Sequence, residues 1–283
     1  MVDHGGVVRR HELSGAEWEF VRPLLPASLR GRKRVDDRRV LNGIVWKFRT
    51  GTAWRDVPER YGPWATLHTR FRRWALDGTF ERMLRTARAH ADAAGDIDWL
   101  VSSDSTIVRA HQHAAGAREK GPATPALGRS RGGLTSKIHL ACDALGRPLA
   151  FILTGGNTND CTRFTAVMEA IRVPRVGPGR PRVRPAHVLG DKGYSSKAIR
   201  AWLRRRNIGH TVPERADQVR NRLRRGRRGG RPPTFDQQLY KRRNVVERCF
   251  NRLKQWRGIA TRYDKTAESY RAAVTLASLL MWA

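Results

Sequence analysis

The second half of the chain alternates apolar, strand-like segments with amphipathic ones, and this order limits the possible folds more than any other feature. Strands are predicted where apolar and β-branched residues cluster, and helices where apolar residues recur every three to four positions. The expected elements, in chain order, are strands at 99–104, 134–142 and 148–154, a helix at 160–171, a strand at 186–191, a helix at 195–203 and a strand at 208–212. A basic insertion and two further helices close the chain. The pattern predicts an α/β domain with one mixed five-stranded sheet and flanking helices.

This order is that of the ribonuclease-H-like fold, in which the first and fourth strands lie side by side at the centre of the sheet. The first predicted strand ends at Asp104, and the fourth ends at Asp191. We therefore expect these two carboxylates to be neighbours. The segment between the first two strands, 111–133, is polar and rich in glycine, so we expect a mobile loop there.

A helix predicted over 240–254 supplies a third carboxylate, Glu247. At about 100° per residue, Tyr240, Arg243, Glu247 and Lys254 fall within roughly 60° of one another on its surface. A separate apolar stripe can dock this helix on a core. The stripe consists of Val246, Phe250 and Leu253. A carboxylate displayed between cations suits a site that holds a divalent metal ion and a phosphate together.

Residues 11–95 show a helical pattern and are predicted to form a separate small all-α domain, followed by the α/β domain over 96–283. Ser14 and Glu17 have the spacing of a capping box. Arg70 and Arg73 lie on a helix expected over 66–74, and short helices with a basic one among them suggest a helix-turn-helix-like DNA-binding domain. The alternative is an ordinary helical bundle whose arginines face solvent.

The charge of the chain points to a polyanionic partner. Lysine and arginine number 56 against 25 aspartates and glutamates, which gives a formal net charge of +31. Nucleic acid is the expected partner, and the alternative is a merely soluble basic protein. The run 220–231, within an insertion at about 215–235, is expected to be a flexible segment that follows DNA, or else a solvated loop.

Cysteine usage and hydropathy suggest a cytoplasmic protein. Cys142, Cys161 and Cys249 are scattered and form no C-x-x-C pair, so neither a disulfide framework nor a zinc ribbon is expected. No apolar signal region is seen at the N-terminus, and the longest apolar stretch, 272–283, is too short to cross a bilayer.

The chain resembles the DDE transposases of bacterial insertion sequences, specifically the insertion-sequence-five family within the insertion-sequence-four-like superfamily. The most specific part of the resemblance is a tyrosine, arginine, glutamate and lysine pattern with gaps of two, three and six residues. It reads Tyr240, Arg243, Glu247 and Lys254 here. The segments Asp104-Ser-Thr and Gly190-Asp191-Lys-Gly-Tyr194 are similar to the two aspartate motifs of the family, and 37–64 is similar to its N-terminal helical domain.

The resemblance implies that Asp104, Asp191 and Glu247 are catalytic and bind metal, with Asp104 bridging two ions. Mg²⁺ is the expected cofactor, and Mn²⁺ can substitute. The expected partner is double-stranded DNA, both element ends and target, bound by a homodimer. The expected DNA contacts are Tyr240, Arg243, Lys254, Lys192, Arg70 and Arg73. Tyr194 is a further candidate for substrate contact, whereas His111 and His113 are expected to be loop residues rather than metal ligands.

The resulting expectation is a transposase that binds the terminal inverted repeats of its element and performs Mg²⁺-dependent cleavage and strand transfer. One alternative is a structure-specific nuclease of the same fold, which performs no strand transfer. Another is a non-catalytic or inactive basic DNA-binding protein, which would not need the carboxylate face of the helix around Glu247. For Arg243 and Lys254, a salt-bridge ladder or a solvated helix face is the structural alternative to phosphate binding.

Overall fold

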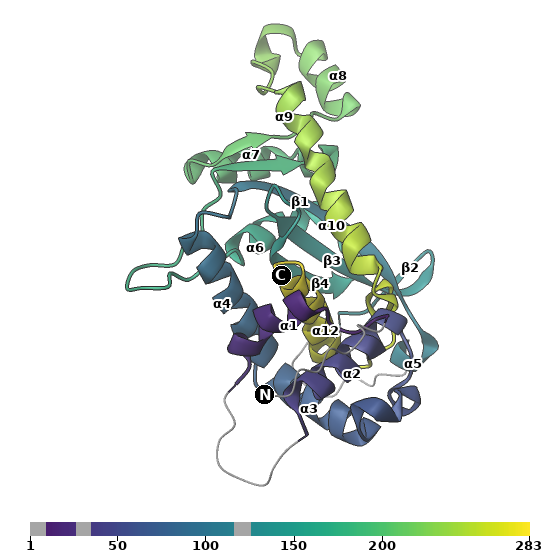
Figure 1. Cartoon of the computed structure of the whole chain (residues 1–283). Helices are drawn as coiled ribbons and strands as arrows, with labels where there is room; N and C mark the ends of the chain where they lie inside the picture. Colours follow the sequence, from purple (N-terminus) through teal and green to yellow (C-terminus); the bar gives the residue numbers. More distant parts are fainter. Residues whose placement is uncertain (1–9, 27–34, 116–125) are drawn as a thin grey trace. The chain divides into compact units, whose positions relative to one another are not determined.

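The computed structural model describes residues 10–26, 35–115 and 126–283 (Figure 1). The chain divides into two compact units that interleave in sequence. One, the helical unit, comprises 1–87, 108–125 and 252–283, and the other, the sheet unit, comprises 88–107 and 126–251. The predicted boundary between a DNA-binding domain (11–95) and a catalytic domain (96–283) stays a prediction, because the two units are defined by packing and not by function.

The sheet unit contains the predicted α/β fold, with five main strands in the order β4-β3-β1-β5-β6. The strands of the described chain in this sheet are β1 (Leu100–Ala110), β2 (Gly128–Ser130), β3 (Gly133–Cys142), β4 (Pro148–Gly155), β5 (His187–Gly190), β6 (Gly209–Thr211) and β7 (Thr261–Arg262). β1, β5 and β6 are parallel, whereas β3 and β4 form an antiparallel hairpin. The expected central pair, the first and fourth main strands, is therefore confirmed as β1 and β5.

The first strand is longer than the sequence suggested. β1 does not end at Asp104 but continues to Ala110, where its last two residues pair with β7 inside the helical unit. The continuation contains Thr106, Ile107 and Val108, whose β-branched side chains favour extended backbone. The expected loop at 111–133 is also partly wrong, because α5 (Gln112–Ala115) and β2 lie within it. Its central part, 116–125, lies outside the described residues.

The helices of the sheet unit begin at short polar side chains. α6 (Phe164–Glu169) packs on β3 and β4. Asp160, at the start of the helix predicted over 160–171, could have served as its cap, but Asn159 caps the 3-10 turn that precedes α6. Asp160 instead accepts a hydrogen bond from Lys137 Nζ at 3.0 Å. α7 (Lys197–Arg205) contacts β6, and Ser196 caps it through the Ile199 amide.

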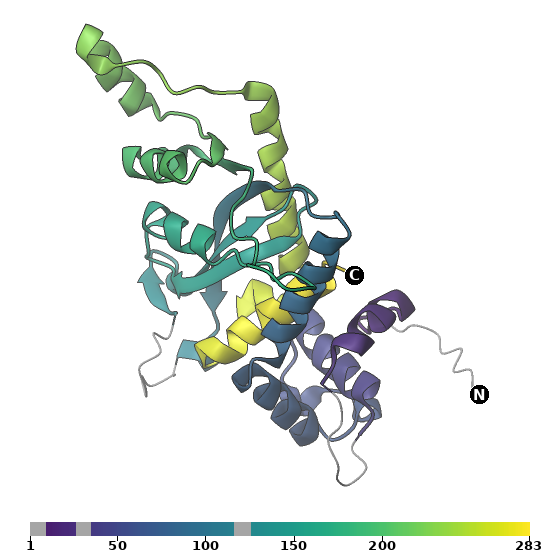
Figure 2. The ribbon, with the colours of Figure 1, turned by 90° about the vertical axis from the view of Figure 1, so that its left-hand side faces the viewer.

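The basic insertion is not a wholly flexible segment, since part of it forms α8 (Ala216–Arg224) and a following 3-10 turn. Polar contacts hold this helix. Arg222 pairs with Glu214 at 2.6 Å, and the Gln218 side chain donates to the Ser195 carbonyl at 3.0 Å. In both Figure 1 and Figure 2, α8 lies beyond α7, away from the strands, and an extended segment leads from it to α9.

The helical unit buries the apolar faces predicted for the N-terminal segment. Its helices include α1 (Gly15–Val21), α2 (Asp37–Thr50), α3 (Trp64–Leu76), most of α4 (Thr79–Ala93), α11 (Arg257–Ala260) and α12 (Ala267–Leu280). The capping box of Ser14 and Glu17 is confirmed at α1. α2 ends at Gly51, whose φ of 74° is the left-handed conformation that glycine adopts easily. α12 packs against α3, so the apolar C-terminal helix completes this core. No helix in the described ranges is long and apolar enough to span a membrane.

A buried imidazole on β3 makes the stability of the sheet unit depend on pH. The side chain of His139 is 1% exposed, and its Nε2 lies 2.9 Å from the Thr154 hydroxyl. Burial lowers the pKa of His139 from 6.5 to about 4, although Asp160 opposes this shift. The folded state therefore favours the neutral ring, and protonation on acidification favours unfolding.

We expect His139→Gln to remove this pH dependence. In the wild type, the contribution is present above pH 6.5 and is lost as pH falls towards 4, with a total of about 3 kcal/mol. Urea unfolding at several pH values between 7 and 4.5 should show the wild type losing more stability than the variant. His90→Gln, at an exposed position on α4, is the control. Parallel curves for wild type and His139→Gln would contradict the assignment.

Candidate active site

Two of the predicted carboxylates follow paired positions on adjacent strands. Ser103 of β1 is the register partner of Gly190 of β5, and Asp104 and Asp191 are the next residues on these parallel strands. Parallel neighbours are about 4.8 Å apart, so the two aspartates leave the strand pair close together. Each carboxylate is fixed by a backbone amide. Asp104 Oδ1 accepts from Ser105 N and Asp191 Oδ1 from Gly193 N, both at 2.8 Å.

The segment that carries Glu247 is helical throughout but not uniformly so. α9 (Gln237–Lys241) passes through a 3-10 turn at Arg242–Asn244 into α10 (Val245–Lys254). The apolar stripe predicted for this helix is confirmed. Its residues Val246, Phe250 and Leu253 are buried, as is Cys249. Val245 and Cys249 lie against Gly146, in the turn between β3 and β4, which brings α10 close to the backbone of the sheet unit.

Arg243 joins the helix to the sheet. Its Nη1 donates to Asp104 Oδ2 at 2.9 Å, and its Nη2 donates to Glu247 Oε1 at 2.7 Å. The arginine is mostly buried, whereas 53% of the Glu247 side chain is exposed. The described structure thus joins Asp104 to Glu247 through Arg243 and places Asp191 beside Asp104. The catalytic and metal-binding roles of these carboxylates stay predictions. Arg243 forms an ion-pair bridge here, so its proposed contact with phosphate stays a prediction.

Asp104 lies in surroundings that favour its neutral form. Burial raises its pKa, and the negative charge of Asp191 adds to this effect. The Ser105 amide and the Arg243 guanidinium act in the opposite direction. A cation next to Asp104 therefore stabilises the charged carboxylate and opposes the rise in pKa that burial causes.

The three carboxylates fit a hard divalent cation in chemistry, because Mg²⁺ prefers oxygen ligands and is usually held by few carboxylates. Among the residues that the structure describes, no three histidine, cysteine, aspartate or glutamate side chains are arranged as a metal-binding group. The guanidinium of Arg243 supplies the positive charge between Asp104 and Glu247. The oxygen donors therefore suit Mg²⁺ in kind, and a metal site at these carboxylates stays a prediction.

The predicted DNA contacts have different surroundings. Tyr240 is half-buried, with its ring 5.2 Å from that of Phe235, and Lys192 is exposed beside Asp191. Burial lowers the pKa of Lys254, on the last turn of α10. In the helical unit, Arg73 is exposed.

Arg70 and Tyr194 are both buried. Arg70 is 8% exposed, and its guanidinium pairs with Asp37 at 2.8 Å. Tyr194, a candidate for substrate contact, packs in the core against Phe164 with ring centroids 5.3 Å apart. In this structure both side chains are engaged in packing.

Sequence reasoning did not single out a group of basic residues around α7. Arg200, Arg204 and His210 line a pocket together with Arg231, the last residue of the basic run. The available signal was the four-residue spacing of Arg200 and Arg204, which places both on one helix face. His210 gave no signal, because strand pairing alone brings it there.

Comparisons with known proteins identify a transposase family. A family model described as "Transposase DDE domain" matches residues 97–282, and one described as "Putative transposase of IS4/5 family (DUF4096)" matches residues 13–84. The "Putative transposase for insertion sequence element IS6501" of Brucella ovis is 30% identical over 149 residues, which cover 53% of this chain and 98% of that protein. The "Putative transposase for insertion sequence element IS402" of Burkholderia cepacia is 35% identical over 146 residues, which cover 52% of this chain and 62% of that protein.

Similarity to solved structures is weaker. The "Mos1 transposase paired-end complex with left transposon end" covers 80% of each chain with 13% sequence identity and a TM-score of 0.27. That level of similarity supports no inference about this chain.

Proposed function

This chain belongs to the transposase family defined by the DDE domain, and on that premise we propose that it binds the terminal inverted repeats of its own element, cuts there and joins the ends to target DNA. One observation carries the proposal. Asp104 and Asp191 directly follow paired residues of the neighbouring strands β1 and β5, and Arg243 links Asp104 to Glu247 on α10. A non-catalytic DNA-binding protein would have no need for three carboxylates brought together inside so basic a chain.

The carboxylates would act as the ligands of Mg²⁺, with two ions expected and Mn²⁺ as a substitute. When bound, the ions would activate the attacking oxygen and neutralise charge on the leaving oxygen. Asp104 and Asp191 would be positioned for this by the strand register and by the amides that fix their Oδ1 atoms. Glu247 would bind from α10, where its side chain is largely exposed to an incoming ligand.

Cationic side chains near the carboxylates would bind the phosphates that flank the scissile bond. Arg243 can exchange a carboxylate for a phosphate, since its planar fork matches both groups. Lys254 lies two turns beyond Glu247 on α10, and Lys192 follows Asp191 directly. Tyr240 has a ring that can stack on a base or a hydroxyl that can donate to a phosphate.

We assign sequence-selective DNA binding to the N-terminal helices, within residues 11–95. Exposed Arg73 on α3 is the candidate contact there, whereas Arg70 is engaged by Asp37. The proposed reaction joins two element ends to one target, so we expect a dimer on the DNA. The net charge of +31 supports binding to polyanionic DNA, which should weaken steeply as salt rises.

The test is a cleavage assay on supercoiled DNA that carries the gene with its native flanks. With Mg²⁺, wild-type protein should cut at the element ends and give joined products, whereas an Asp104→Ala/Glu247→Ala double variant should do neither. Cuts without any joined product would favour a structure-specific nuclease of the same fold. Binding without cutting, in Mg²⁺ and Mn²⁺ alike, would contradict the proposed catalysis.

A further inference from the structure

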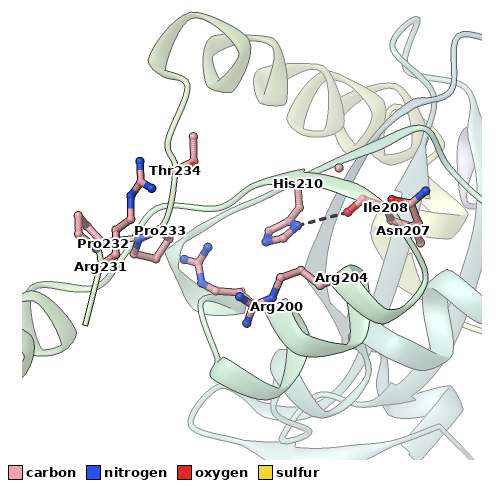
Figure 3. Close-up of a pocket in the computed structure, with 10 residues that line it drawn as sticks. Arg200, Arg204, Asn207, Ile208, His210, Arg231, Pro232, Pro233 and Thr234 are labelled. Atoms are coloured by element: carbon pink, nitrogen blue, oxygen red, sulfur yellow. Dashed lines mark hydrogen bonds between the residues drawn. The ribbon is translucent and has the colours of Figure 1, made fainter. Parts of the chain in front are cut away.

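A basic pocket of about 710 Å³ lies in the sheet unit, apart from the carboxylates (Figure 3). Figure 3 shows the arginines of α7 and His210 facing a separate segment of chain at the end of the basic insertion. The lining residues that carry the argument are Arg200, Arg204, His210, Arg231 and Thr234. None of the side chains that line the pocket is acidic.

Arg200 is the buried cation of this pocket. It is 8% exposed, and its Nη2 donates to the Val212 carbonyl at 2.8 Å. Its Nη1 is buried and has no hydrogen-bond partner. Burial lowers the pKa of Arg200, with Arg204 acting in the same direction and Glu214 against it. Glu214 is itself paired with Arg222. A buried guanidinium donor without a protein acceptor is unfavourable, so Arg200 Nη1 is suited to donate to an anion.

The chemistry of the lining selects phosphate. The guanidinium groups of Arg204 and Arg231 can bind phosphate oxygens bidentately, Arg200 Nη1 can donate one hydrogen bond, and Thr234 adds a hydroxyl. His210 Nδ1 lies 3.3 Å from the Ile208 carbonyl, which can only accept, so Nδ1 carries the proton. The Nε2 of the neutral ring is an acceptor, so the phosphate donors of this pocket are the arginines and Thr234. The lining includes no phenylalanine, tyrosine or tryptophan on which a base could stack. A sugar-phosphate backbone fits these residues better than a free nucleotide does.

We propose that this pocket binds a phosphate of a DNA strand and anchors the strand away from the site of cleavage. The inference rests on the proposed action on DNA and adds a second contact to it. It also gives the basic insertion a role, because the run 220–231 ends with Arg231 in the pocket. The chain continues from Thr234 into α9 and α10, so a bound phosphate would hold the segment that leads to Arg243 and Glu247.

The experiment compares two double variants that each lose one arginine from α7 and one from the basic run 220–231. Arg204→Gln/Arg231→Gln removes the exposed pocket arginines, and Arg205→Gln/Arg227→Gln removes exposed arginines that do not line it. Duplex DNA binding is measured at several salt concentrations without divalent metal, after thermal unfolding has shown that both variants are folded. We expect the pocket variant to bind about tenfold more weakly than the control, with a salt slope smaller by about one.

Titrations of the DNA-free protein with pyrophosphate, a dinucleoside phosphodiester and thymidine identify the source of the phosphate. The phosphodiester should bind to wild type and to the control variant but not to the pocket variant, and thymidine should not bind. Pyrophosphate binding that needs the pocket, together with equal DNA affinities of the two variants, would assign a free phosphate ligand and overturn the proposal. Equal behaviour of the two variants with every probe would overturn it as well. None of these measurements requires cleavage, so a protein that binds DNA through the pocket but never cuts it would contradict only the proposed function.

Discussion

Asp191→Asn is expected to lower the rate of Mg²⁺-dependent cleavage at the element ends by at least about 100-fold while DNA affinity stays within about twofold of wild type. Substitutions in the shell around metal ligands already cost 10- to 100-fold, and a direct ligand should cost no less. Asp191 Oδ1 accepts a hydrogen bond from the Gly193 amide at 2.8 Å and so caps the 3-10 turn after β5. Asparagine keeps an acceptor oxygen at this position. The local backbone should therefore keep its conformation, and the loss should be one of catalysis.

The matched control is Asp98→Asn, which removes the same charge from a largely exposed side chain that pairs with Arg242. Single-turnover cleavage and filter binding are measured for both variants on one labelled end. Cleavage by Asp191→Asn at the rate of the Asp98→Asn control would remove Asp191 from the metal site. An equal loss of binding and cleavage would instead indicate a folding or DNA-binding role.

The central part of the site could be predicted because it depends on strand order and helical periodicity. Once the first and fourth strands are neighbours, Asp104 and Asp191 must lie together, and the register of Ser103 with Gly190 fixes them to the same level. The apolar stripe of Val246 and Phe250 indicated which face of α10 would be buried. Apolar side chains recur every two residues in a strand and every 3.6 residues in a helix, and both spacings can be seen in the sequence itself.

Other features depend on contacts between distant residues, and no local pattern contains them. The helical spacing of Arg70 suggested an exposed DNA contact, but the carboxylate of Asp37, 33 positions earlier, holds its guanidinium in a buried ion pair. Asp160 had the composition of a helix cap, yet Lys137 on β3 engages it, and Asn159 caps the turn. The high charge of the insertion gave no sign of the helix α8. This helix is held by contacts with Glu214 and Ser195, which both precede it in the chain.

Arg243→Gln should lower cleavage by about 100-fold near neutral pH and should also move the acidic limb of the pH–rate profile to higher pH. Burial already raises the pKa of Asp104, and Arg243 is the cation that opposes this effect. Loss of the guanidinium raises the pKa further, so Asp104 is protonated at a higher pH and the active carboxylate form is lost earlier on acidification. Single-turnover rates between pH 5.5 and 8.5, at saturating DNA, measure the shift.

The pH profile separates two roles that a rate at one pH cannot distinguish. If Arg243 acts only on a phosphate, Arg243→Gln lowers the rate by the same factor at every pH, because the ionisation of Asp104 is unchanged. If the bridge between Asp104 and Glu247 matters, the loss grows as pH falls. Arg248→Gln, on an exposed face of the same helix, controls for the general loss of positive charge and should leave the limb in place. A displaced limb in Arg243→Gln alone would mean that the guanidinium of Arg243 holds down the pKa of the buried Asp104 carboxyl.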